Sequence, residues 1–461
     1  MTAELEAALA RVPDYDRFYT FAEMLDSAHG VAASHPDLVS IERVGSSTEG
    51  RPIEMVRIGD GPQRLLLYAL PHPNEPIGAM LVQFLLEELV ANEALRRGRS
   101  WYLLPCVDPD GTVLNEGWFA GPFTVRNYAR HFYRPRSVEQ VEWTFPISYK
   151  TFRFDDPIPE TRALMAALER VRPHFVYSLH NAGFGGAYYY LSHDVPTAYA
   201  TLHELPRSRD LFLSLGEPEM PWAVELHPAV YRSPLVTAAY DHYERFGPPG
   251  KDPAELIQGG ASSFDYLRTL GLTDTVTLVT ELPYFQSAAI QDTRPAGMTR
   301  REVVLAGVAK AAELVAVLKR ALERVRPHVD PTERFFRTVD SFAAYFDTHL
   351  ETQRRWAETA EGMDEPATVA QRADELYVRT FYRLLIVSML RRSIESHLRA
   401  IDNPSLSDAL ADLEEHLDRW ADEVETNLGS SAIPIKRLVE VQYGAMLAVL
   451  GSGVVPGGTE A

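Results

Sequence analysis

Short apolar runs alternate with helical patterns through the first three hundred residues, and this alternation constrains the fold more than any other feature. Residues 65–70 form a buried strand pattern, and residues 77–95 then carry apolar side chains at helical spacing. Residues 101–104, 175–179 and 275–280 are three further strand candidates. Strands that alternate with crossover helices predict an α/β fold with a mixed, mostly parallel sheet flanked by helices.

The pattern changes near residue 301. Residues 301–325 form one long helical run, which stops at Arg326 and Pro327. From there to the end, the chain consists of helix formers with apolar residues three and four apart. We therefore expect an α/β domain over 1–325 and an all-helical C-terminal region over 326–461.

The charge balance narrows the range of partners. The chain has 64 acidic and 45 basic residues, a net charge of −19. Because such a chain repels phosphate groups, we expect neither a nucleic acid nor an anionic membrane as its partner.

A single cysteine, Cys106, excludes an intramolecular disulfide and thiol-rich zinc modules. The first residues carry no apolar signal segment and no apolar run is long enough to span a bilayer, so we expect a cytoplasmic protein.

Ionisable residues follow three of the expected strands. His72 and Glu75, in an H-x-x-E pattern, come after the first, and His180 and Glu281 each come directly after a later one. An H-x-x-E pattern alone is common, and an isolated histidine is more often structural than a ligand. Open α/β sheets, however, bind ligands at the carboxyl ends of their strands, where these side chains would converge. Two histidines and one glutamate are a known ligand set for zinc in hydrolases.

Five motifs occur in the order typical of one enzyme family. The chain resembles the zinc carboxypeptidases of the carboxypeptidase A type over roughly residues 19–325. The motifs that carry this resemblance are S-S-T-E-G-R-P-I at 46–53, H-P-N-E at 72–75, D-P-D-G at 108–111, S-L-H at 178–180 and T-E-L at 280–282. Each motif is loose by itself, but five in the correct order are specific.

The resemblance implies one zinc ion per chain, held by His72, Glu75 and His180. It also implies that Glu281 is the catalytic general base, which takes a proton from the zinc-activated water and passes it to the leaving amine. The expected activity is that of a zinc metallocarboxypeptidase. Such an enzyme hydrolyses the C-terminal peptide bond, or a related amide bond, of a peptide with a free C-terminus.

The residues that hold the substrate match the family less well. The family's N-R-N-F motif corresponds to A-R-H-F here, which keeps Arg130 as the predicted partner of the substrate carboxylate. Asn127 is the candidate to replace the missing asparagine, and Arg126 is the candidate to polarise the scissile carbonyl. The alternative for Arg126, Arg134 and Arg136 is a solvated basic loop.

Phe264 occupies the expected specificity position. It lies in G-G-A-S-S-F-D-Y, which resembles the family's G-G-S-x-D-W segment. Because this side chain is neither acidic nor basic, it argues against a preference for basic or acidic C-terminal residues. The family's substrate-capping tyrosine aligns with Ile257, which leaves the identity of the capping residue open.

Two other functions stay open at this stage. One is a binding or scaffold protein on an impaired peptidase fold, which the lost motif residues would suit. The other is a zinc amidohydrolase acting on a small peptide-like substrate. The helical C-terminal region is a candidate for restricting access to the site or for forming a homo-oligomer.

Overall fold

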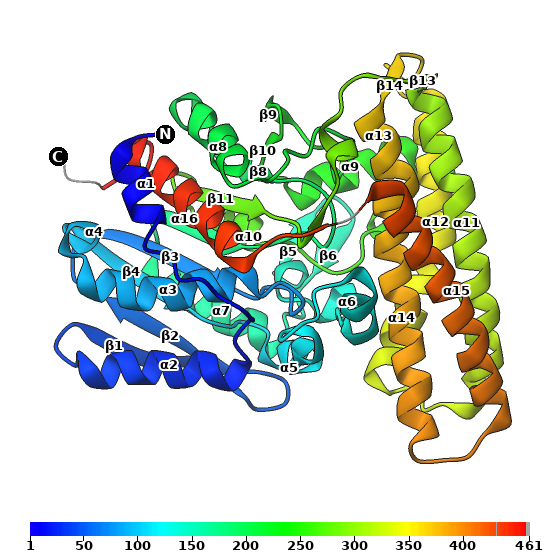
Figure 1. The fold of residues 1–461 in the computed structure, drawn as a ribbon, viewed down its shortest axis with the longest axis horizontal. Helices are drawn as coiled ribbons and strands as arrows, with labels where there is room; N and C mark the ends of the chain where they lie inside the picture. Colours follow the sequence, from blue (N-terminus) through cyan, green and yellow to red (C-terminus); the bar gives the residue numbers. More distant parts are fainter. Residues whose placement is uncertain (430, 458–461) are drawn as a thin grey trace.

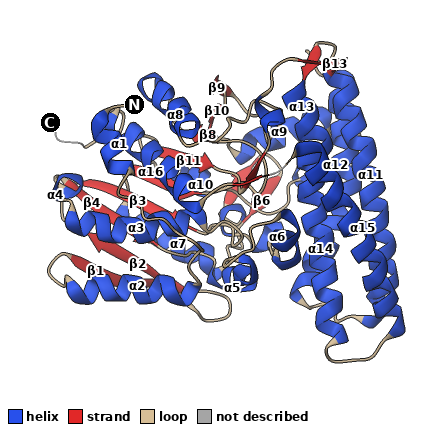
Figure 2. Cartoon of the chain, viewed as in Figure 1, coloured by secondary structure: helices blue, strands red, loops and turns tan. Residues whose placement is uncertain are grey.

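A nine-stranded mixed sheet forms the centre of the α/β part of the protein (Figures 1 and 2). The computed structural model describes residues 1–429 and 431–457. The four strands in the middle of the sheet, from β4 to β11, are parallel, and the strands at both margins include antiparallel pairs. In sheet order the strands are β1 (Val39–Ser46), β2 (Pro52–Ile58), β4 (Arg99–Leu104), β3 (Gln63–Ala69), β7 (Phe175–Leu179), β11 (Val276–Glu281), β8 (Tyr188–Leu191), β10 (Val230–Arg232) and β9 (Glu225–His227).

The continuous apolar run of β3 is explained by helices on both faces of the sheet. Leu65 and Leu67 belong to one hydrophobic core, and Leu66 and Tyr68 belong to another, because successive side chains of a strand point to opposite faces. The first core includes residues of α2 (Phe21–Ser34) and α3 (Ile77–Ala91), and the second includes residues of α7 (Pro159–Val171). The predicted α/β class is therefore confirmed.

Shorter elements complete the α/β part. The helices are α1 (Ala3–Leu9), α4 (Glu93–Arg96), α5 (Pro109–Asn115), α6 (Val125–His131), α8 (Pro196–Ser208), α9 (Val236–Phe246) and α10 (Ser263–Thr269). The small two-stranded sheets pair β5 (Ile147–Tyr149) with β6 (Phe152–Phe154), β12 (Phe285–Gln286) with β15 (Ser431–Ala432), and β13 (Pro295–Thr299) with β14 (Pro366–Thr368).

A helical bundle stands beside the α/β part, at the right of Figure 1. Its long helices are α11 (Arg300–Val325), α12 (Arg334–Thr359), α14 (Arg379–Leu398) and α15 (Pro404–Leu428), with the short α13 (Val369–Ala373) before α14. Within the described ranges, no helix combines the length and hydrophobicity that crossing a membrane requires.

The division of the chain at 325 stays a prediction, and the packing of two helices bears on it. The helix α11 packs against α12, α14 and α15, so the bundle begins at Arg300. The last helix, α16 (Ile435–Gly451), leaves the bundle and packs against α3 and α8 of the α/β part. An apolar stripe on a helix does not identify the surface that it covers, so the sequence pattern does not show which elements these two helices pack against.

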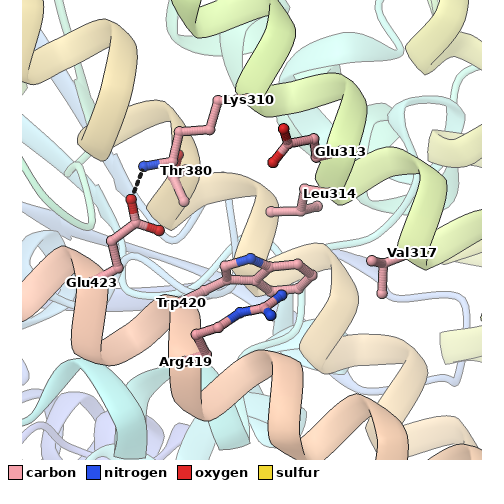
Figure 3. Close-up of a pocket in the computed structure, with 8 residues that line it drawn as sticks. All are labelled: Lys310, Glu313, Leu314, Val317, Thr380, Arg419, Trp420 and Glu423. Carbon is pink, nitrogen blue, oxygen red and sulfur yellow. Dashed lines mark hydrogen bonds and ion pairs between the residues drawn. The ribbon is translucent and has the colours of Figure 1, made fainter.

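The bundle contains a cavity of about 230 Å³ between α11, α14 and α15 (Figure 3). Lys310 on α11 and Glu423 on α15 line the cavity and form an ion pair with each other, and the indole of Trp420 also lines the cavity. None of its lining residues is a predicted site residue.

Candidate metal centre

Three neighbouring parallel strands bring the predicted ligands to one edge of the sheet. The strand β7 lies between β3 and β11 and is parallel to both, so the carboxyl ends of all three meet at the same edge. Ala69, the last residue of β3, pairs with Leu179, and His180 follows directly. After β3, Leu70 adopts a left-handed backbone with φ of 56°, and the chain then turns into the loop that carries His72 and Glu75.

His72, Glu75 and His180 form the predicted three-residue group. All three are buried, and their candidate ligand atoms lie within 4.8 Å of one another. Glu75 Oε2 is 3.0 Å from His180 Nδ1, and the two imidazole centroids are 4.9 Å apart. The prediction that these residues lie together is confirmed.

The donor set fits a zinc ion. The Nδ1 atom of His72 is buried without a hydrogen-bond partner in the described part of the chain, as expected of an atom that has a ligand role. Burial, together with the charges of Arg134 and His180, holds the pKa of His72 well below its usual value, so this imidazole is neutral and able to bind a metal. Two neutral imidazoles and a carboxylate are the ligand set of many catalytic zinc sites.

His180 has the opposite balance of effects. Burial opposes its protonation, but the hydrogen bond with Glu75 and the charges of Glu75 and Glu281 raise its pKa to about 9 when no metal competes for the site. Metal binding at this position therefore has to displace a proton.

Glu281 lies beside the ligand group at the end of β11. Its Oε1 atom is 4.0 Å from His180 Nδ1, and 12% of its side chain is exposed. Burial raises the pKa of this carboxyl well above its usual value; Glu75 and Glu219 raise it further, while His180 and Arg134 oppose the rise. A partly desolvated carboxylate at the rim of a metal site is suited to accept a proton.

Arg134 is the arginine that the structure brings to the metal ligands. Its guanidinium donates to Glu75 Oε1 at 3.2 Å and to Gln140 Oε1 at 3.0 Å. With 29% of its side chain exposed, it is not a freely solvated loop residue. The sequence indicates Arg134 only as one of three arginines of a basic loop, because Arg134 belongs to none of the recognised motifs.

The two other candidate arginines face the helical bundle. Arg126 and Arg130 lie one turn apart on α6, so both point from the same face of that helix. Arg126 forms ion pairs with Asp418 and Asp422, and Arg130 pairs with Glu414 at 2.7 Å. The acidic residues share the same four-residue spacing on α15, so the two faces are complementary. The substrate roles of Arg126 and Arg130 stay predictions.

Asn127 and Phe264 also stay predictions. The side-chain amide of Asn127 donates to the carbonyl of Pro122 at 3.0 Å, an exposed contact at the start of α6. Phe264 is half-buried at the second position of α10.

A buried carboxylate that no motif indicated anchors α10. Glu142 accepts a hydrogen bond from the backbone N–H of Ser263 at 2.9 Å and from the Ser178 hydroxyl at 3.0 Å. The hydroxyl of Tyr68 also donates to it. Since Ser178 lies two residues before His180, this network couples the start of α10 to the strand that carries a ligand.

Two C-terminal helices reach the loop that carries His180. The side-chain amide of Gln442, on α16, donates to the carbonyl of His180 at 2.9 Å. The hydroxyl of Tyr382, on α14, accepts a hydrogen bond from the N–H of Gly183 at 3.0 Å. The helical part of the chain thus helps to hold the metal-ligand loop in place.

Comparisons with known proteins agree with this site. Residues 24–217 match the family described as zinc carboxypeptidase, a range that contains all three ligands and ends before Glu281. A carboxypeptidase B from Astacus astacus is 27% identical over 105 residues; this stretch is 21% of the chain and spans only about a third, 35%, of that protein.

Solved structures of similar proteins include carboxypeptidase A from Helicoverpa armigera, with 16% identity and a TM-score of 0.36 over 61% of this chain and 70% of that one. Another is bovine thrombin-activatable fibrinolysis inhibitor in complex with tick carboxypeptidase inhibitor, with 14% identity and a TM-score of 0.36 over 57% of this chain and 86% of that one.

Proposed function

We propose that the chain, whose residues 24–217 match the zinc carboxypeptidase family, is a metallocarboxypeptidase that hydrolyses the C-terminal peptide bond, or a related amide bond, of a peptide substrate. One observation carries the proposal: a complete two-histidine, one-glutamate ligand group has a separate carboxylate, Glu281, within 4.0 Å of one of its members. Structural zinc sites have four protein ligands, whereas three ligands with a second carboxylate beside them suit a hydrolase.

His72, Glu75 and His180 would hold the zinc ion. When bound, zinc polarises a substrate carbonyl and lowers the pKa of a water molecule towards about 7. Glu281 accepts a proton from the attacking water as the new carbon–oxygen bond forms. The same carboxyl then gives the proton to the amine nitrogen as the carbon–nitrogen bond breaks, so its charge is restored at the end of the cycle.

Two arginines are candidates for the substrate's anionic groups. Arg130 is the motif-based candidate for the terminal carboxylate, and it is engaged with Glu414. Arg134 is favoured by its place, since its guanidinium contacts Glu75 at the metal ligands. We propose that the Arg134 guanidinium binds the terminal carboxylate of the substrate. Arg130 contributes only if its ion pair with Glu414 opens.

The test is a pair of peptides that differ only at the C-terminus. The zinc-loaded protein should hydrolyse a peptide with a free C-terminal carboxylate and leave the same peptide, amidated, nearly intact, because a lost charge-assisted contact costs about 2–5 kcal/mol. Equal hydrolysis of both peptides would make the protein an amidohydrolase or endopeptidase. Zinc binding without any hydrolysis would favour the binding or scaffold function.

The cellular setting is also part of the proposal. We propose a cytoplasmic protein whose partner is a peptide rather than a nucleic acid or membrane. Subcellular fractionation tests the location, and light scattering of the purified chain tests self-association through the helical bundle.

A further inference from the structure

The cavity in the helical bundle is lined by charged side chains of both signs (Figure 3). The helix α11 contributes Lys310 and Glu313, and α15 contributes Arg419 and Glu423. Lys310 and Glu423 neutralise each other, because they form an ion pair. The remaining acid and the remaining base therefore determine which charges a ligand of this cavity has to carry.

Glu313 and Arg419 have no ionic partner in the part of the chain that the structure describes. Both side chains are exposed, and they belong to different helices. One guanidinium nitrogen of Arg419 lies 2.7 Å from Nδ1 of His416 on the same helix, which leaves its other N–H groups available to a ligand. One unmatched carboxylate and one unmatched guanidinium thus line the same cavity.

The indole of Trp420 offers an unused hydrogen-bond donor. Only 7% of this residue is exposed, and among the described residues its Nε1–H finds no acceptor. Figure 3 shows the ring in the cavity lining, with its nitrogen edge on the side of Thr380 and Leu314. Since a buried tryptophan N–H usually has a hydrogen-bond partner, an acceptor oxygen inside the cavity would complete this contact.

The rest of the lining is apolar. Leu314 and Val317 are buried on α11 and lie three residues apart, so they share the face of the helix that contacts the cavity. The volume of the cavity, about 230 Å³, is smaller than that of pockets for drug-sized ligands, which is about 300–1,000 Å³. The cavity is therefore suited to a small molecule with an apolar part and charges of both signs.

We infer that this cavity binds a free α-amino acid with an apolar side chain, such as leucine, as a zwitterion. The ammonium group pairs with Glu313, and the carboxylate accepts hydrogen bonds from Arg419 and from the Trp420 indole. The apolar side chain contacts Leu314 and Val317. A simple anion would leave the Glu313 charge unmatched, and a simple cation would leave the Arg419 charge unmatched.

This amino-acid site is separate from the proposed catalytic site. The cavity shares no lining residue with His72, Glu75, His180 or Glu281. Its binding does not depend on the proposed function, although a carboxypeptidase would release amino acids of this class.

The first experiment follows the indole N–H resonances of the wild-type protein by nuclear magnetic resonance as leucine is added. Trp420→Phe keeps an aromatic ring but lacks the N–H, so it identifies the Trp420 resonance. Leucine should shift this resonance to saturation. 4-Methylpentanoate, which lacks the ammonium group, and 3-methylbutylamine, which lacks the carboxylate, should bind about tenfold more weakly or worse. An unshifted Trp420 resonance, or equal affinity for the three compounds, overturns the inference.

The second experiment removes the two unmatched charges one at a time. Glu313→Gln and Arg419→Gln should each weaken leucine binding about tenfold in calorimetry, because each removes one charge-assisted contact. The matched control is Glu323→Gln, which removes a charge from an exposed position of α11 outside the cavity lining and should keep the wild-type affinity. Wild-type affinity in either cavity variant overturns the inference.

These measurements need no turnover, so they separate the amino-acid site from the proposed function. Leucine that binds only at the metal centre, as a reaction product, would leave the Trp420 resonance unshifted and would bind Glu313→Gln as tightly as the wild type. That result rejects the cavity site and leaves the carboxypeptidase function intact. A protein that shows the Trp420 shift but hydrolyses no peptide keeps the amino-acid site and loses the proposed function.

Discussion

Two groups of charged side chains in this protein differ in their burial, the one at the metal-ligand edge of the sheet and the one at the contact between α6 and α15. At the sheet edge, Glu75 and His180 have only 4% and 11% of their side chains exposed. Between the helices, Arg126 and Arg130 keep 37% and 40% exposed. The first group is positioned by hydrogen-bonded neighbouring strands, whereas the second depends on which helix happens to pack alongside.

This difference explains which motifs were informative. A residue at the end of a central parallel strand has its place set by the register of the sheet, and so the motif residues His180 and Glu281 lie together. A residue on an exposed helix face can meet a substrate or a neighbouring helix, and a motif cannot distinguish the two. The arginines of α6 belong to this second kind.

The largest expected effect is loss of the metal. His180→Ala removes one of three ligands and should reduce zinc content from near one per chain towards zero, with activity lost in parallel. Elemental analysis of the purified variant measures the zinc content. Arg126→Ala, at the other charged contact, is the control and should retain zinc. A His180→Ala protein with full zinc content would contradict the assigned ligands.

The second effect concerns the base. Glu281→Gln preserves the shape of the side chain but removes the proton acceptor, so kcat should fall by about 10²-fold or more while zinc content is unchanged. Single-turnover hydrolysis of a free-acid peptide, together with zinc analysis, measures both quantities. Activity equal to that of the wild type would leave Glu281 with a structural role only.

The third effect compares two arginines directly. Arg134→Ala removes a partly buried guanidinium at the metal ligands. For a free-acid peptide, kcat/KM should fall by the equivalent of about 2–5 kcal/mol of activation free energy. Arg130→Ala removes an exposed contact with Glu414 and should change the free energy of unfolding by about 0–1 kcal/mol, with a smaller effect on catalysis.

Peptide hydrolysis and urea denaturation of both variants measure these changes. If Arg130→Ala lost the preference for acid over amide substrates while Arg134→Ala kept it, Arg130 would be the arginine that binds the terminal carboxylate, as the motif predicts. The ion pair of Arg130 would then be one that opens during catalysis.

The smallest effect is a pH dependence of zinc binding. Despite burial, Glu75 and Glu281 raise the pKa of His180 to about 9, and zinc binds only the neutral imidazole. A proton therefore competes with zinc below this pH, and the apparent affinity should fall as the pH falls, by up to about tenfold per pH unit. Zinc competition with a chelator between about pH 6 and about pH 9 measures the slope. An affinity independent of pH would mean that His180 is already neutral.

Much of the α/β part could be predicted because its strands are buried. The run at 175–179 coincides with β7, and 275–280 differs from β11 by one residue at each end. A strand covered on both faces has to be apolar along its whole length, which makes it easy to recognise. The bundle helices were equally recognisable, but their packing partners were not.

The sequence by itself determined the chemistry of the metal edge, namely two imidazoles, a ligand carboxylate and a second carboxylate, each tied to the end of a predictable strand or to the loop after it. Only the tertiary structure decided which arginine joins them and that α14 and α16 contact the loop that carries His180. The physical reason is the range of the interactions. Buried strands and local turns require particular residue types at regular positions, so they can be recognised in the sequence. Contacts between distant loops and helix faces depend on shapes that form only when the whole molecule folds.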